Sequence, residues 1–307
     1  MNNYYFFDKN KKGTMLSTAE KSGLAYSMAA ILPAIFSLVF VIVLSAVGIT
    51  KEAQGQDWYL YLSFLLPQIA SAVLIFWFVK FTKTPLLQAT GVKKTHWKYF
   101  LLAVALQIGL LSLSEVNVWF IELLSEAGYA GGDIVLPSLD GFGFVGVLLV
   151  VGILPALLEE GVFRGILLNG LKGFGTLGCC LLCGGLFALY HQNPSQTIYQ
   201  FCCGCAFALV AVRSGSALPT MLSHFINNAL ILVLTKLGVE TFPVWFFVIS
   251  AVCLVGSLIY LIFLDEKKTD EPQPQEEKKS VIAKQFFLCA SVGIFIYSVT
   301  WVASLFV

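Results

Sequence analysis

The chain has 307 residues, of which 58% are hydrophobic and only 12% are charged. Soluble domains carry about 25% charged residues, so this composition excludes an ordinary soluble globule. The formal net charge of +1 hides a pattern, because the charged residues form short clusters between apolar stretches of roughly 20 residues, the length that crosses a bilayer.

The apolar stretches predict an all-α fold, a polytopic transmembrane helical bundle of about nine spans. We expect a cytoplasmic segment at residues 1–23, a membrane domain at 24–264, a polar linker at 265–284 and a C-terminal transmembrane helix at 285–307. The linker contains prolines and charges of both signs, which disfavour a packed core. The individual spans are expected at 24–49, 58–80, 99–121, 143–171, 175–192, 195–212, 216–235, 242–264 and 285–307.

Basic residues predict the orientation, because positively charged loops stay on the cytoplasmic side. The loop 122–140 contains no Lys or Arg and falls outside when the spans alternate. We therefore expect an integral, multi-pass protein of the plasma membrane with a cytoplasmic N-terminus. The residues expected on the cytoplasmic side are Lys9, Lys11, Lys12, Lys21, Lys80, Lys83, Lys93, Lys94, Lys98, Lys172, Arg213 and the lysines of 267–284.

The eight cysteines include two clusters, at 179–183 and 202–205, that invite a metal or iron–sulfur interpretation. Structural zinc sites usually take paired C-x-x-C spacing on turns, whereas both clusters lie in apolar runs. Cysteine in such a run acts as a small packing residue at close helix contacts. Packing is therefore the favoured interpretation, with metal binding, thiol chemistry or a disulfide as the alternatives.

Polar residues inside the spans indicate the candidate site. An ionisable side chain in a spanning helix costs about 3 kcal/mol, so each one is a functional candidate. Glu115 in the third span stands apart from the others, and His96 lies in a basic loop where we expect it to be solvated. The remaining set is Glu159, Glu160, Arg164, His191, His224, Asn227 and Asn228.

The spacing within residues 159–165 is helical. Glu160 and Arg164 are four residues apart with the acid first, which favours an intrahelical ion pair and offsets part of the burial cost. Glu159 points about 100° away around the helix and stays free for another partner. Gly161 and Gly165 form a small-x-x-x-small pair that predicts the close approach of another helix.

The histidines lie on two further spans. His224 and Asn228 are four residues apart and share a helix face, while Phe187 lies one turn before His191 and can form a wall of the pocket. If the fifth span starts near Gly178, His191 lies at a depth similar to that of Glu159, whereas a start at Phe174 would place it near the outer membrane face. His224 is expected at a shallower depth, so these groups can meet only if the helices tilt or break.

Together these groups predict hydrolytic chemistry. A carboxylate and an imidazole in a pocket that excludes water can hold and deprotonate a water molecule, and Glu159 and His191 fit this role. A second histidine and an asparagine supply N–H donors for the oxyanion that develops on a peptide carbonyl, and His224 and Asn228 fit that role. The alternative is a polar patch that only joins helices.

Three ordered patterns also resemble a known family. Residues 159–164 (EEGVFR) match E-E-x-x-x-R, residues 187–191 (FALYH) match F-x-x-x-H, and residues 224–228 (HFINN) match H-x-x-x-N. The text RSGSALPTMLSHFINN resembles the usual lead into the third motif. In this order, over about residues 150–232, the chain resembles the CAAX protease and bacteriocin-processing (CPBP, also called Abi) family of intramembrane proteases.

The resemblance implies an all-helical protease core at about residues 143–235 and a membrane-associated or lipidated peptide or protein as substrate. Eukaryotic members remove the last three residues from prenylated C-terminal Cys motifs, and some bacterial members are linked to bacteriocin immunity or maturation. No nucleic-acid partner is expected. The implied catalytic residues are Glu159 and His191 for water activation and His224 and Asn228 for the oxyanion, supported by Glu160, Arg164 and Phe187.

Three rival interpretations stay open. Family members are also described as metalloproteases, and Glu159, His191 and His224 could complete a zinc site. The sequence has no H-E-x-x-H helix, so metal-free water activation without a cofactor is favoured. A transporter or proton relay could use the same residues, but the chain shows no repeated halves. A non-catalytic immunity or scaffold protein is the third possibility.

Overall fold

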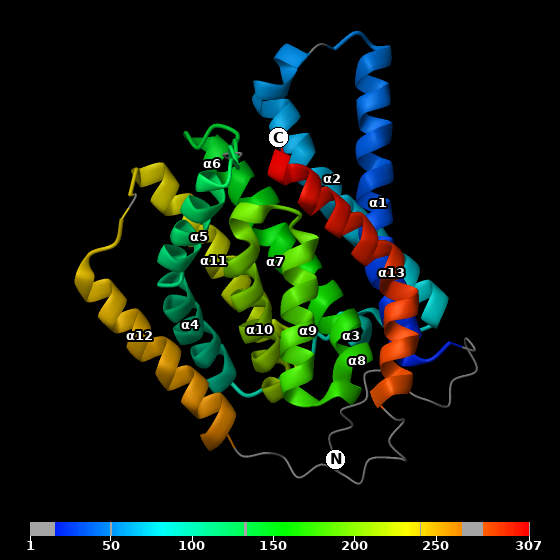
Figure 1. Cartoon of the computed structure of the whole chain (residues 1–307), viewed down its shortest axis with the longest axis vertical. Helices are drawn as coiled ribbons and strands as arrows, with labels where there is room; N and C mark the ends of the chain where they lie inside the picture. The colour runs from blue at the N-terminus through cyan, green and yellow to red at the C-terminus, as the bar shows by residue number, and fades with distance from the viewer. Residues whose placement is uncertain (1–15, 50, 132–133, 240, 266–278, 307) are drawn as a thin grey trace.

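The computed structural model describes residues 16–49, 51–131, 134–239, 241–265 and 279–306. Most of the expected N-terminal segment, including Lys9, Lys11 and Lys12, and most of the expected linker lie outside the described residues. Within the described ranges the regular secondary structure is helical, with no β-strand. The predicted all-α, polytopic bundle is confirmed (Figure 1).

Eight helical runs in the described ranges are long and apolar enough to cross a membrane, as expected of an integral multi-pass membrane protein. One of them, Phe142–Tyr190, contains two of the expected spans, which meet at a turn where Gly175 has a φ of +77°. This run accounts for the difference from the expected nine. The others are Thr18–Ala46, Asp57–Thr82, Lys98–Glu126, Pro194–Ser214, Leu218–Leu237, Val244–Leu264 and Lys279–Phe306.

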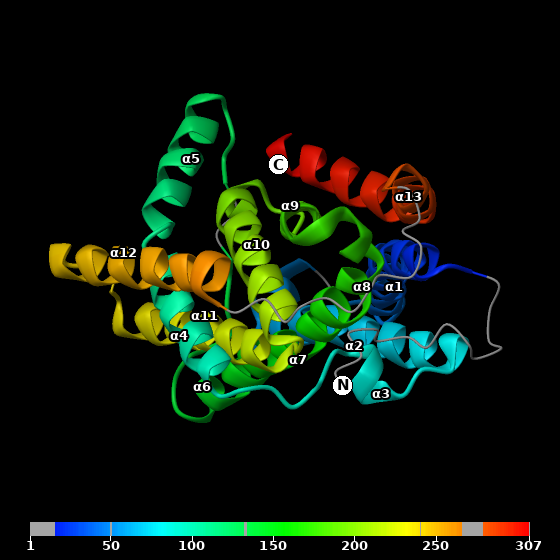
Figure 2. The ribbon, with the colours of Figure 1, turned by 90° about the horizontal axis from the view of Figure 1, so that it is seen from below.

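Two outer groups of helices flank the centre. On one side α1 (Thr18–Ala46) and α13 (Lys279–Ala303) pack along each other next to α2 (Asp57–Thr82) (Figure 2). A Cβ at Gly23 would collide with the backbone of Phe286, so glycine permits this close approach. Helices α1 and α13 therefore form one packed pair beside the helices of the centre.

On the other side, the third span is divided into α4 (Lys98–Leu111) and α5 (Ser114–Glu126). Helix α12 (Val244–Ile259), continued by a π-helical turn to Leu264, packs on α4 where a Cβ at Gly109 would collide with the backbone of Leu254. Short 3₁₀ turns lie at Lys51–Gly55, Lys172–Phe174, Pro194–Gln196 and Ser304–Phe306.

The helical run that carries both glutamates is irregular. It comprises α6 (Phe142–Val147), α7 (Leu154–Glu160) and α8 (Leu168–Leu171), separated by π-helical turns at Leu148–Ile153 and Gly161–Leu167. A π-helical turn closes hydrogen bonds five residues apart, so the side chains beyond it lie on a different face from those of a regular helix. Such turns occur frequently at functional sites.

Three helices complete the centre: α9 (Gly175–Tyr190), α10 (Thr197–Ser214) and α11 (Leu218–Leu237). A Cβ at Gly204 would lie 2.7 Å from the Cα of Gly184, so the two glycines allow α9 and α10 to approach closely. The predicted close approach at Gly165 is also observed. Its neighbour is the chain at Thr90, directly after the short helix α3 (Leu86–Ala89), rather than another span.

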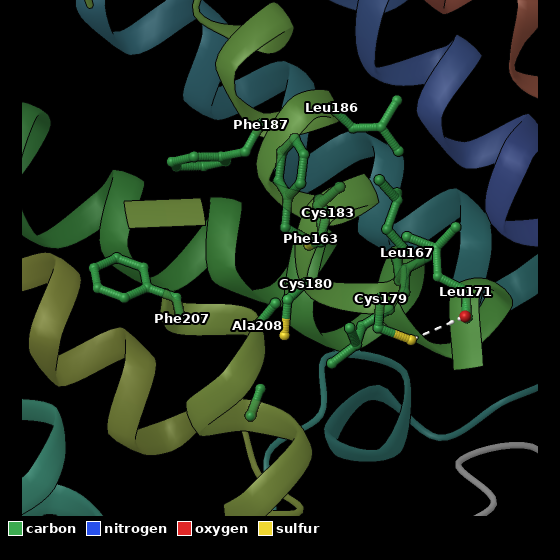
Figure 3. Close-up of a cluster of buried hydrophobic side chains, with 14 of the residues drawn as sticks. Phe163, Leu167, Leu171, Cys179, Cys180, Cys183, Leu186, Phe187, Phe207 and Ala208 are labelled. Carbon is green, nitrogen blue, oxygen red and sulfur yellow. Dashed lines mark hydrogen bonds between the residues drawn. The ribbon is translucent and has the colours of Figure 1, made fainter. Parts of the chain in front are cut away.

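The cysteines of α9 belong to the hydrophobic core of this centre (Figure 3). Cys179, Cys180 and Cys183 are buried, and the Cys179 thiol donates a hydrogen bond of 2.9 Å to the carbonyl oxygen of Leu171. All eight cysteines of the chain are free thiols. Their position agrees with the expected packing role.

Candidate active site

A buried ion-pair centre joins the first motif to the third. Glu160 Oε1 accepts hydrogen bonds from Arg164 Nη1 at 2.8 Å and from His224 Nδ1 at 3.0 Å. The Glu160 and Arg164 side chains are fully buried, and His224 is 6% exposed. The predicted pair four residues apart is therefore confirmed, and the same carboxylate also holds the imidazole of α11.

Arg164 is enclosed by backbone and aromatic groups. Its Nη2 donates to the carbonyl oxygen of Gly204 at 3.2 Å, and its guanidinium carbon lies 4.6 Å from the ring centre of Phe187 and 5.2 Å from that of Phe207. Planar guanidinium groups stack on aromatic faces in this way. These contacts hold Arg164 in place as a structural cation of the site.

Glu159 has a different neighbour, which the sequence analysis missed. Its side chain is buried, and its Oε1 accepts a hydrogen bond of 3.4 Å from Gln68 Nε2 of α2. Gln68 is itself buried, and its Oε1 has no hydrogen-bond partner within the described chain. Glu159 and Glu160, although adjacent in sequence, therefore face separate surroundings, as their predicted 100° separation around the helix requires.

His191 follows the last residue of α9. Its Nδ1 lies 2.8 Å from the carbonyl oxygen of Phe187, while its backbone N–H donates to Ala188 instead. A carbonyl oxygen can only accept, so Nδ1 carries the hydrogen in this contact. In the neutral ring Nε2 then keeps its lone pair, and the imidazole presents a proton acceptor on its other side.

Phe187 contacts His191, beside which it was expected, and also His224, which was not expected. Its ring centre is 4.6 Å from that of His191 and 6.1 Å from that of His224. The irregular helical run and the end of α9 at Tyr190 together bring the second motif beside the third. In the described part of the chain no hydrogen bond joins Glu159 directly to His191.

Asn228 is held by the backbone of the run that carries the first motif. The acceptor is the carbonyl oxygen of Val151, which lies in the π-helical turn Leu148–Ile153. Asn228 Nδ2 donates to this oxygen at 2.9 Å. An amide NH₂ group carries two hydrogens, so this bond leaves one for a further acceptor.

Two buried glutamines belong to the site but were not predicted from the sequence. Besides Gln68, the fully buried Gln107 of α4 contributes, since its Nε2 donates to Asn227 Oδ1 at 2.7 Å. A glutamine in the middle of an apolar span costs free energy unless it is hydrogen-bonded, and this was an available signal. His96 and Glu115, set apart from the site by the sequence analysis, are both exposed.

The His, Cys, Asp and Glu side chains of the described chain are not arranged as metal ligands. Within the described ranges, no group of three or more His, Cys, Asp or Glu side chains is arranged to hold a metal ion. Glu160 and the Nδ1 atom of His224 are already bound to each other. The side chains of the described site therefore do not fit a metal ion.

The fold and these contacts define a polytopic membrane protein with a buried Glu–Arg–His centre formed by two helical runs. The family model described as type II CAAX prenyl endopeptidase Rce1-like matches residues 141–230, less than a third of the chain. This match confirms the resemblance of the three motifs to the CAAX protease family. No curated protein and no solved structure matches the chain.

Proposed function

We propose that the protein is an intramembrane endopeptidase that cleaves a lipidated or membrane-associated peptide near its C-terminus. The observation that carries this proposal is the shared carboxylate of Glu160, which binds Arg164 of the first motif and His224 of the third. A buried ion-pair centre inside spanning helices is costly, and such groups usually mark function. The family match at residues 141–230 supports the reaction class.

In the proposed reaction, Glu159 and His191 Nε2 hold a water molecule, and Glu159 takes its proton as the oxygen attacks the scissile carbonyl carbon. The carbonyl oxygen becomes an oxyanion that accepts hydrogen bonds from Asn228 Nδ2 and from the Nε2–H group of His224, whose Nδ1 is bound to Glu160. The carbon–nitrogen bond then breaks, and Glu159 returns the proton to the leaving amine. The reaction requires no cofactor in this form.

A cleavage assay in detergent tests the proposal. We expect the purified full-length protein to release the last three residues from a farnesylated peptide with three residues after its modified cysteine, as detected by mass spectrometry. Glu159→Gln keeps the side-chain size but removes the proton acceptor, so the rate should fall by about 10²–10⁴. Glu115→Gln, the same change at an exposed glutamate, should leave the rate unchanged.

Two results would count against this function. If wild-type protein released no product from the farnesylated or the unmodified peptide, the non-catalytic scaffold interpretation would be favoured. If Glu159→Gln worked within a few-fold of wild type, Glu159 would not be the general base.

We also propose that the protein lies in the plasma membrane with its N-terminus in the cytoplasm. The start of α1, α3, the end of α10 and the end of α12 lie at one end of the bundle (Figure 1). Basic residues gather there, and Lys98 binds Asp265 at 2.7 Å. Because positively charged loops are retained inside, a reporter inserted in 265–284 should read cytoplasmic and one in 125–140 external. The opposite result for either insertion would contradict this orientation.

A further inference from the structure

A chain of buried amides ends on Asn228. Asn227 Nδ2 donates to Asn228 Oδ1 at 3.0 Å. On its other side, Asn227 Oδ1 accepts from Tyr199 OH at 2.6 Å and from Gln107 Nε2 at 2.7 Å. These side chains come from α4, α10 and α11, and Gln107 lies outside the segment that matches the CAAX protease family.

The donor and the acceptor of each hydrogen bond in this network are fixed by one backbone group, the carbonyl of Val151. The carbonyl oxygen of Val151 can only accept, so Asn228 must turn its Nδ2 atom toward it. Asn228 Oδ1 then faces Asn227 and requires a donor, which is Nδ2 of Asn227. The oxygen of Asn227 is consequently turned toward Tyr199 and Gln107, both of which donate to it.

At the other end of this hydrogen-bond network, Gln107 and Tyr199 make further hydrogen bonds. Ser223 Oγ shares its one hydrogen between the carbonyl oxygen of Ala103 at 3.1 Å and Gln107 Oε1 at 3.3 Å. Gln107 Nε2 also lies 3.3 Å from the Tyr199 hydroxyl. The backbone N–H of Tyr199 donates to Asn117 Oδ1 at 3.3 Å. Gln107 is fully buried and Asn227 is 5% exposed, so water competes little for these bonds.

We propose that Asn227, Tyr199 and Gln107 are positioning residues that keep the amide of Asn228 in the orientation needed to bind the oxyanion. A reversed Asn228 amide would place Oδ1 against the Val151 carbonyl and offer a lone pair where the reaction develops negative charge. The network opposes this reversal, because Asn227 would then meet an NH₂ group with its own NH₂ group. This inference rests on the oxyanion role of Asn228 in the proposed function.

Kinetics of the full-length protein with the farnesylated peptide test this role. Asn228→Ala should lower kcat by about 10²–10³, the usual effect of removing one oxyanion donor. Asn227→Leu, which retains the side-chain size, should lower kcat at least about tenfold with KM within about twofold, because only the transition state gains from the donor. In the Asn228→Ala background, Asn227→Leu should cause no further loss.

Tyr199→Phe provides a second and milder variant, since it removes a single oxygen atom. We expect a loss in kcat of about two- to tenfold in the wild-type background and none in the Asn228→Ala background. Tyr59→Phe, which lies on α2 and outside the network, is the matched control and should leave kcat unchanged.

The outcomes distinguish a failure of the oxyanion role of Asn228 from a failure of the positioning role of its neighbours. If Asn228→Ala alone left kcat within a few-fold of wild type, the oxyanion role in the proposed function would fail. If Asn228→Ala were severe but Asn227→Leu and Tyr199→Phe left kcat unchanged, or lowered it by the same factor in both backgrounds, the positioning role would be overturned. A network with a purely structural role predicts that kcat falls by the same factor in both backgrounds, together with a lowered melting temperature.

Discussion

The two sides of the candidate site are held by different kinds of interaction. On the α11 side, Glu160 binds both a guanidinium and an imidazole through one oxygen atom. On the α9 side, Glu159 accepts one long bond from Gln68, and His191 bonds to its own helix backbone. The first arrangement fixes charged groups against one another, whereas the second leaves a carboxylate and an imidazole nitrogen available as proton acceptors.

We therefore expect the α11 side to contribute mainly to the stability of the fold and the α9 side mainly to the cleavage reaction. Breaking a buried ion pair leaves an uncompensated charge, which is strongly destabilising. Losing a single neutral hydrogen bond costs much less. Substitutions on the α11 side should therefore affect folding as well as activity, and those on the α9 side should mainly affect the reaction.

The largest effect is expected from Glu160→Gln. This change weakens the partner of Arg164 and should lower the free energy of unfolding by about 3–5 kcal/mol, visible as a lower melting temperature in detergent. Glu159→Gln is the matched control, because it makes the same change one residue earlier and should leave the melting temperature near that of wild type.

A double variant sharpens this test. Replacing both members of the pair, as in Glu160→Leu with Arg164→Met, removes the unpaired charge and should destabilise the fold less than Glu160→Gln alone. Equal losses of melting temperature from Glu159→Gln and Glu160→Gln would contradict the division between the two sides.

His191→Ala tests the opposite side. Removing the imidazole should lower the cleavage rate by about 10²–10⁴, the range for a group that assists proton transfer. Stability should fall by only about 1 kcal/mol, because the main bond lost is the one to the Phe187 carbonyl. A rate within a few-fold of wild type, or a loss of stability as large as that of Glu160→Gln, would remove His191 from the proposed mechanism.

A smaller effect is expected at Gln68. The change Gln68→Leu removes the donor to Glu159 Oε1, a hydrogen bond worth about 0.5–1.5 kcal/mol, so the rate should change by about tenfold at most. Steady-state cleavage measures this effect, with Gln54→Leu, at an exposed position in the 3₁₀ turn that precedes the same helix, as control. If both variants behaved alike, Gln68 would have no part in orienting Glu159.

The membrane spans and part of the candidate site could be predicted from the sequence, because the signals for them are local. Apolar stretches of bilayer length indicated the spans, and the four-residue spacing of Glu160 and Arg164 predicted their ion pair. The contact of Phe187 with His191 followed from the same helical spacing.

The remainder depends on contacts between distant parts of the chain. Gln68 meets Glu159 across 91 residues, and no periodicity within either span specifies that encounter. The π-helical turns are equally non-local, since the sequence alone did not distinguish Leu148–Ile153 or Gly161–Leu167 from regular helix. The second partner of Glu160 is His224, 64 residues further along the chain, and the two meet only because α11 packs on α7.

The smallest effect, no change at all, is expected from removing metal. A catalytic zinc requires three protein ligands at about 2.0–2.2 Å. In the described chain the candidate ligands do not form such a group, and Glu160 already occupies one nitrogen of His224. Protein purified without added metal should therefore contain far less than one zinc per chain, as measured by elemental analysis, and should keep its cleavage rate after chelation. Stoichiometric zinc that is lost together with activity in His191→Ala would instead establish the metalloprotease alternative, with Glu159, His191 and His224 as ligands.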